Sequence, residues 1–249
     1  MKKKALFFAM YLFLFLFILN NYLNINKTAY TKVNENDVKS TESKNIYLTF
    51  DDGPSPIVTD KILDILKENN VKGTFFLIGN KVEENTDVVK RIYKEGHGIG
   101  LHTYTHNYKK IYKSREGFIQ EMLQCSDEVY EVTGVKSNVI RFPGGSNKHL
   151  DEEFLAQLHG YGFKIYDWNM QLRDGIDYRI PAHKLYEQGT KNSDKFTNIF
   201  LLMHCDAVNK NTYEALPDII KYYKNKGYEF QVITEDTPEN HFRTRSINK

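Results

Sequence analysis

Cysteine is scarce in this chain. Only two cysteines, Cys125 and Cys205, occur among the 249 residues, and they lie far apart in the sequence. Two cysteines exclude a disulfide framework, and the lack of a Cys-x-x-C pair excludes a zinc site or redox dithiol of that type. Cysteine content alone does not distinguish a cytosolic protein from an exported one.

The chain also lacks a strong excess of either charge. Its 34 basic and 32 acidic side chains give a formal net charge of +2. The field of the whole protein therefore does not require nucleic acid or an acidic polymer as a ligand, and we expect no nucleic-acid partner. The length suits one mid-sized domain with a sizeable core and a short extra segment.

The chain also lacks an uninterrupted apolar run as long as a bilayer span. Residues 5–19 are wholly apolar and follow three lysines at 2–4, which is the layout of an export signal. The run is short for a bilayer span of about 20 residues, although Tyr22, Leu23 and Ile25 could extend it. We therefore expect 1–25 to be a signal peptide or membrane anchor. We favour the uncleaved anchor, because no small-x-small cleavage site follows, and in either case the remainder is exported.

The rest of the chain divides into a linker, one domain and a tail. Residues 26–44 are polar and aperiodic and are predicted to form a linker, and the polar tail at 237–249 is expected to be frayed. Between them, 45–236 alternates short apolar segments with amphipathic ones. We expect strands at 46–50, 73–78, 99–101, 139–142, 163–166, 198–203 and 229–233, and helices at 57–69, 87–95, 116–133, 152–158, 180–187 and 213–225. Such alternation predicts an α/β fold of parallel strands under helices, either a closed barrel or a doubly wound sheet.

Polar side chains gather where the predicted strands end. In α/β barrels, active sites are assembled at the carboxyl ends of the strands. Five separate segments that deliver such groups to one edge are hard to attribute to solubility. The residues are Asp51, Asp52, His102, Arg141, His204 and, somewhat beyond its strand, Asp174.

Two of these segments predict a metal site. Asp51 and Asp52 end a strand, so that one carboxylate can bind a cation while the other handles a proton, although Asp-Gly-Pro is also an ordinary turn. His102 and His106 are four residues apart, and on a helical turn both imidazoles would face one side. Two histidines and one carboxylate leave open positions on a metal, as catalytic sites do.

In order and spacing, five motifs resemble those of the NodB-type polysaccharide deacetylases, also called carbohydrate esterase family 4. They cover about residues 45–235, nearly all of the part predicted to be exported. The resemblance implies a distorted (β/α) barrel, with a single catalytic domain behind the N-terminal apolar segment. The motifs are 49–54, 102–106, Arg141-Phe142-Pro143-Gly144-Gly145, the segment from Trp168 to Asp174, and Leu201-Leu202-Met203-His204.

The resemblance implies a role for each matching residue. Asp52, His102 and His106 would hold a divalent metal, most often zinc, with cobalt, nickel and manganese as alternatives. Asp51 would be the general base that deprotonates the metal-bound water, and Arg141 would keep it ionised.

The remaining roles concern the leaving group and the substrate. His204 would be the general acid that protonates the departing amine, with Asp174 orienting it. The backbone N–H of Gly144 would stabilise the oxyanion. Pro143 and Trp168 are candidates for substrate binding.

The sequence also departs from the family pattern. Gln171 and Gly175 replace the first aspartate and the tryptophan of the fourth motif, and Gly144 stands where many members have tyrosine. Cys205 follows His204 where aspartate is common, and Asp206 is a candidate to compensate. These changes open the sugar groove and remove none of the bond-breaking groups. The segment 109–115, with Tyr108 and Tyr112 among its charges, is interpreted as a solvated face that is also placed to touch the glycan.

We therefore expect an exported hydrolase that removes N-acetyl groups from a cell-wall amino sugar polymer, namely from the N-acetylglucosamine or N-acetylmuramic acid of peptidoglycan. Deacetylation of chitin oligomers or an exopolysaccharide, or O-acetyl xylan esterase activity, are alternatives within the same chemistry. A non-catalytic glycan-binding relative and a tethered structural protein are alternatives from other classes. The sequence leaves the sugar, the native metal, the fate of the N-terminal segment and the oligomeric state open.

Overall fold

The computed structural model describes residues 43–244. The predicted signal peptide or anchor at 1–25, nearly all of the predicted linker and residues 245–249 lie outside the described residues. Within 43–244, every helix is too short or too polar to cross a membrane.

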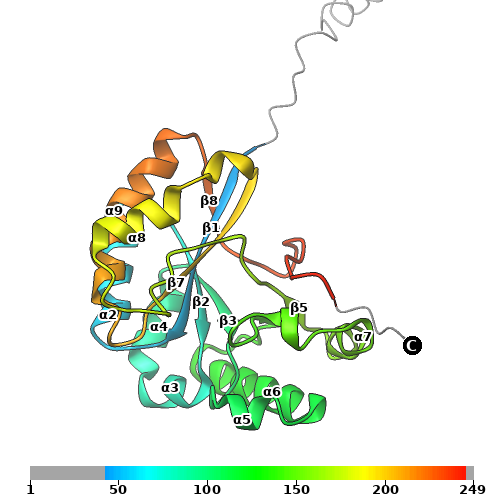
Figure 1. Ribbon diagram of the computed structural model, residues 1–249. Helices are drawn as coiled ribbons and strands as arrows, with labels where there is room; N and C mark the ends of the chain where they lie inside the picture. Colours follow the sequence, from blue (N-terminus) through cyan, green and yellow to red (C-terminus); the bar gives the residue numbers. More distant parts are fainter. Residues whose placement is uncertain (1–42, 245–249) are drawn as a thin grey trace, which may run out of the picture. The chain divides into compact units, whose positions relative to one another are not determined.

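One curled sheet of parallel strands forms the centre of the domain (Figure 1). The strand order is β5-β4-β3-β2-β1-β7-β6, and β8 pairs with the start of β1. Within 43–244 no ladder joins β5 to β6, so the sheet is an open, distorted barrel, as predicted. The strands are β1 (Asn45–Gly53), β2 (Thr74–Leu77), β3 (Gly98–Leu101), β4 (Val139–Ile140), β5 (Lys164–Ile165), β6 (Met170–Gln171), β7 (Asn198–His204) and β8 (Glu229–Gln231).

Helices cover the outer face of this sheet (Figure 1). The predicted helices are all present, whereas α3, α5 and the strand β6 were not predicted. Helices α3 and α5, of six and four residues, are too short to show a helical period. The helices are α2 (Val58–Glu68), α3 (Gly79–Glu84), α4 (Thr86–Lys94), α5 (Tyr108–Ile111), α6 (Arg115–Thr133), α7 (Glu152–Gly160), α8 (Ala182–Thr190) and α9 (Lys210–Asn225), with short 3-10 turns at Ser146–Lys148 and Ser193–Lys195.

Alternation along β1 and β7 decides which side chains enter the barrel. Successive residues of a strand point to opposite faces. In β1, Ile46, Leu48 and Phe50 belong to the large core between the sheet and the helices. Thr49 lies between two of them and Asp51 directly follows Phe50, so both lie on the inner face. The same alternation in β7 places Phe200 in the smaller inner core, and His204 lies on that face too.

The C-terminal segment packs against the open side of the barrel. Tyr166 forms a parallel bridge with Asn240, and the backbone N–H of Phe242 donates to Asp167 Oδ2 over 2.8 Å. Glu239 Oε1 accepts a hydrogen bond of 2.7 Å from the N–H of Ile165. The expectation of a frayed tail is therefore wrong for the residues up to 244, because these side-chain contacts order a segment whose composition is polar.

Candidate active site

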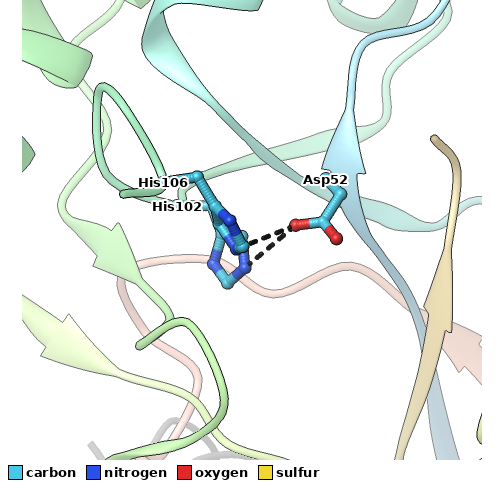
Figure 2. A group of neighbouring side chains, drawn as sticks. All are labelled: Asp52, His102 and His106. Carbon is cyan, nitrogen blue, oxygen red and sulfur yellow. Dashed lines mark ion pairs between the residues drawn. The ribbon is translucent and has the colours of Figure 1, made fainter. Parts of the chain in front are cut away.

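Three potential metal ligands converge at the ends of β1 and β3. Asp52 Oδ1 lies 3.4 Å from His102 Nε2 and 3.2 Å from His106 Nε2 (Figure 2). The ligand atoms of the three residues all lie within 4.8 Å of one another. The histidines lie in the loop between β3 and α5, so the helical turn expected for them is wrong. The loop nevertheless turns both rings toward the aspartate.

These residues fit a divalent cation. His102 Nδ1 lies 2.9 Å from the carbonyl of Arg141, which only accepts, so that Nδ1 carries the proton and Nε2 presents a lone pair. Burial and the neighbouring His102 lower the pKa of His106 to about 4, which keeps that ring neutral. Asp52 Oδ1 is buried and has no hydrogen-bond donor among the described residues. Lone pairs that face one another without a donor are what a metal ion satisfies, and a set of two nitrogens and one oxygen suits zinc.

The backbone around these ligands is strained. Asp52, Thr103 and His106 have φ values of 68°, 65° and 52°, and Arg173, beside Asp174, has 66°. Such left-handed conformations cost non-glycine residues about 1–3 kcal/mol each and gather at functional sites. Thr103 Oγ1 accepts the N–H of His106 over 3.1 Å, which helps to hold this loop.

Lys81, on the helix that follows β2, supports the backbone of Asp52. The sequence analysis did not identify it. From α3, its Nζ donates to the backbone carbonyl of Asp52 over 2.9 Å and to Asp206 Oδ1 over 3.0 Å. Asp206 therefore holds Lys81 and does not take the place of an aspartate beside His204. A half-buried lysine with two acceptors fixes the backbone that carries a metal ligand.

Asp51 is held by a buried arginine. Arg141 is fully buried, and its Nη1 donates to Asp51 Oδ1 and to Thr49 Oγ1, each over 2.8 Å. The same guanidinium stacks 4.0 Å from the centre of the Phe76 ring. Asp51 Oδ2 lies 3.7 Å from His102 Nε2, so the second oxygen of this carboxylate borders the candidate metal site.

His204 lies on the strand beside Asp51 and is held by Asp174. The parallel register pairs Asp51 with His204, and His204 Nδ1 lies 2.9 Å from Asp174 Oδ1. Asp174 is 1% exposed and also accepts hydrogen bonds from the N–H groups of His204 and Gly175 and from Thr212 Oγ1. Burial opposes protonation of His204, but Asp174 and the two nearby aspartates outweigh it and raise its pKa to about 9.

The departures from the family pattern shape this side of the site. A side chain at Gly175 would place its Cβ 2.3 Å from His204 Cε1, so the imidazole occupies space that any other residue would need. Gly144 has a φ of 75°, and within 43–244 no acceptor is found for its N–H. The Pro143 carbonyl accepts from Tyr112, and the Trp168 ring lies 5.9 Å from the Arg141 guanidinium carbon.

Asp167 is a further buried carboxylate that the sequence reasoning missed. It is fully buried, and its Oδ1 accepts from the N–H of Ser146 over 3.0 Å, while Oδ2 accepts from the Ser146 hydroxyl and the N–H of Phe242. Burial raises its pKa. Asp167 thus fastens the loop after Gly144 to the C-terminal segment. Asp167 directly follows the predicted strand at 163–166, as the other site residues follow theirs, and this position could have identified it from the sequence.

Comparison with known proteins identifies the family. The polysaccharide deacetylase profile matches residues 38–166. A peptidoglycan-N-acetylglucosamine deacetylase of Bacillus cereus is 36% identical over 224 residues, which are 88% of this chain and 77% of that protein. The chain belongs to the polysaccharide deacetylase family. It is therefore an enzyme of the deacetylase type, and its motifs are those of carbohydrate esterase family 4.

Other members of the polysaccharide deacetylase family agree with this assignment. A peptidoglycan-N-acetylmuramic acid deacetylase of Bacillus subtilis is 31% identical over 209 residues, covering 84% of this chain and 77% of its own length. The crystal structure of the polysaccharide deacetylase Bc1974 from Bacillus cereus superposes with a TM-score of 0.73 at 35% identity, over 81% of this chain and 96% of that one. The distorted barrel predicted for this chain is thus the fold of the family.

Proposed function

We propose that this protein is a divalent-metal-dependent deacetylase that removes N-acetyl groups from peptidoglycan, acting on N-acetylglucosamine or N-acetylmuramic acid. The substrate class is supported by the two relatives whose names specify these sugars. The observation that carries the proposal is that three possible ligand atoms meet beside a second carboxylate, Asp51, whose neighbour on the adjacent strand is His204, held by Asp174.

Asp52, His102 and His106 are the proposed ligands of the metal, which we take to be zinc. When bound there, a divalent cation lowers the pKa of water and polarises the acetyl carbonyl. The undonated Oδ1 of Asp52 and the two Nε2 atoms are the donors that support this assignment.

Asp51 is the proposed general base. Arg141 donates to Oδ1, which leaves Oδ2 to accept the proton of the attacking water. The buried guanidinium also fixes the orientation of the carboxylate, because its hydrogen bond holds Oδ1 in place. Thr49 and the carbonyl of Tyr166 keep Arg141 in place.

His204 is the proposed general acid. Its Nδ1 is engaged by Asp174, so Nε2 delivers the proton to the departing amine. The raised pKa keeps the ring protonated at neutral pH. The free N–H of Gly144 donates to the acetyl oxygen as negative charge develops on it. Pro143 and Trp168 are the proposed contacts with the sugar.

Peptidoglycan lies outside the cytoplasmic membrane, so the proposal requires export. The cationic and apolar segment at 1–25 supports it as a signal or an anchor. An anchored enzyme would act on glycan close to the membrane.

Acetate release from purified peptidoglycan tests the proposal. We expect the zinc-loaded enzyme to release acetate, and Asp51→Asn to lose about 10²- to 10⁴-fold in turnover while zinc stays bound, because a general base contributes that much. The matched control is Asp60→Asn, which also removes a carboxylate paired with an arginine, Arg91, but lies outside the site. It should keep full activity.

Near-wild-type acetate release by Asp51→Asn would contradict the assigned base. Chitin oligomers, an exopolysaccharide and acetyl-xylan should be assayed in parallel. Preferential release from one of these would establish the corresponding alternative, and release from none of them, peptidoglycan included, would favour a glycan-binding protein without catalysis.

A further inference from the structure

Tyr108 borders the candidate metal site, and the lysine-rich segment next to it was predicted to be a solvated face that is also placed to touch the glycan. It is the first residue of α5, and its ring meets the His106 ring edge to face, with centroids 5.4 Å apart. The side chain is 49% exposed. Within 43–244, its hydroxyl has no hydrogen-bond partner, whereas the hydroxyls of Tyr112, Tyr166 and Tyr223 all find acceptors.

The other end of Tyr108 meets the loop that carries Gly144. A Cβ built at position 144 would lie 3.0 Å from the Tyr108 hydroxyl oxygen. The hydroxyl therefore lies against the Gly144 backbone, whose N–H also lacks an acceptor among the described residues. Two unused donors, one phenolic and one peptidic, thus belong to neighbouring groups, and the ring that carries the first also contacts His106.

The surroundings hold Tyr108 in this place. The side-chain oxygen of Asn107 accepts from the N–H groups of Lys109 and Lys110 and so caps the short helix on which Tyr108 lies. The Tyr108 ring also contacts Tyr112 edge to face at 5.8 Å, and the Tyr112 hydroxyl donates to the Pro143 carbonyl over 2.6 Å. Helix α5 and the Gly144 loop are therefore fastened together directly beside the phenol.

We propose that the Tyr108 hydroxyl donates a hydrogen bond to the acetyl oxygen of the bound N-acetyl sugar, beside the Gly144 N–H. The inference rests on the proposed function, since it concerns the same reaction. An acetyl group that contacts both the metal site and the N–H of Gly144 would occupy the space between His106 and Gly144. Tyr108 borders that space, because it contacts both residues. A donor aimed at an oxygen that gains negative charge stabilises the transition state more than the bound substrate.

Steady-state kinetics of Tyr108→Phe in the zinc-loaded full chain tests this role. Loss of one donor to an oxyanion lowers kcat about 10²- to 10³-fold. We expect such a loss with KM changed by less than about threefold and zinc stoichiometry unchanged, because phenylalanine keeps the ring against His106. The matched control is Tyr130→Phe, which removes a hydroxyl from a residue that is 44% exposed on α6 and should leave both constants unchanged.

Three results would overturn the proposal. Unchanged kcat and KM in Tyr108→Phe would show that the hydroxyl makes no contact that matters to the reaction. A raised KM with normal kcat would assign it to binding of the sugar, and loss of zinc would assign it to support of His106. If the wild-type enzyme releases acetate while Tyr108→Phe does so equally well, only the role of Tyr108 fails; an inactive wild-type enzyme would refute the proposed function itself.

Discussion

At the ends of β1 and β3, Asp52, His102 and His106 bring three possible ligand atoms together, and Asp52 Oδ1 has no donor among the described residues. By contrast, Asp174, which follows β6 and holds His204 at the end of β7, receives a donor at both oxygens. The first group carries strained backbone at two of its three residues. The second forms a complete network within the protein. In the function proposed above, a metal ion completes the first group, whereas the fold alone pre-organises the second.

The two sides should consequently respond differently to loss of a carboxylate. Removing an oxygen that lacks a donor removes repulsion from the metal-free chain, whereas removing one that has several donors leaves those donors unsatisfied. A variant of Asp52 should also lose metal binding, whereas a variant of Asp174 should keep it. The predictions below use these contrasts, from the largest expected effect to the smallest.

Asp52→Asn should abolish metal binding. We expect zinc binding to fall from one equivalent to none, with turnover lost by at least about 10³-fold, because a metal contributes several kcal/mol of transition-state stabilisation and about 1.4 kcal/mol is tenfold. Asparagine tolerates the left-handed backbone at this position, so the metal-free chain should unfold at an unchanged temperature. Metal analysis and thermal unfolding measure both effects, and full zinc occupancy in this variant would refute the ligand assignment.

Asp174→Asn should leave zinc bound but impair the proposed general acid, His204. The amide presents an N–H toward other donors, so we expect a stability loss of about 1–3 kcal/mol in denaturant unfolding. Turnover should fall about 10²-fold as the support of the general acid is lost.

The same variant should also change the pH profile. In the wild type, His204 stays protonated until the pH rises through its raised pKa of about 9, after which the acid is lost. Without the charge of Asp174, burial lowers the pKa of His204, so the alkaline limb of the profile should move to lower pH. A limb at the wild-type position would contradict the role of Asp174.

Lys81→Met tests whether the hydrogen bond from Lys81 to the Asp52 carbonyl supports metal binding. We expect zinc affinity to fall about tenfold, at the lower end of the range for groups that orient metal ligands. Lys81→Arg should restore part of the affinity, because a guanidinium can still donate to the Asp52 carbonyl. Zinc titration by calorimetry measures both variants, and equal affinity in Lys81→Met and the wild type would exclude the positioning role.

The sequence predicted the parts of the fold and site that depend on local pattern. Alternation along β1 puts Asp51 on the inner face, and the carboxyl ends of parallel strands bring Asp52, His102 and His204 to one edge. Such placement follows from the period of a strand and the direction of the sheet, so no detailed packing had to be known.

The missed features depend on contacts between distant residues. Lys81 lies on a helix of six residues, too short for a periodic signal, and its acceptors are 29 and 125 residues away. The order of the C-terminal segment depends on Asp167, whose partner Phe242 is 75 residues away. Tyr108 could not be told from a solvated tyrosine until the Gly144 loop was placed beside it.

The most direct test of the account is anomalous diffraction from crystals of the enzyme grown with zinc. We predict one peak, about 2.0–2.2 Å from Asp52 Oδ1, His102 Nε2 and His106 Nε2, which are ordinary zinc distances for oxygen and nitrogen ligands. A fully occupied zinc elsewhere, with these three side chains left unliganded, would contradict the central claim.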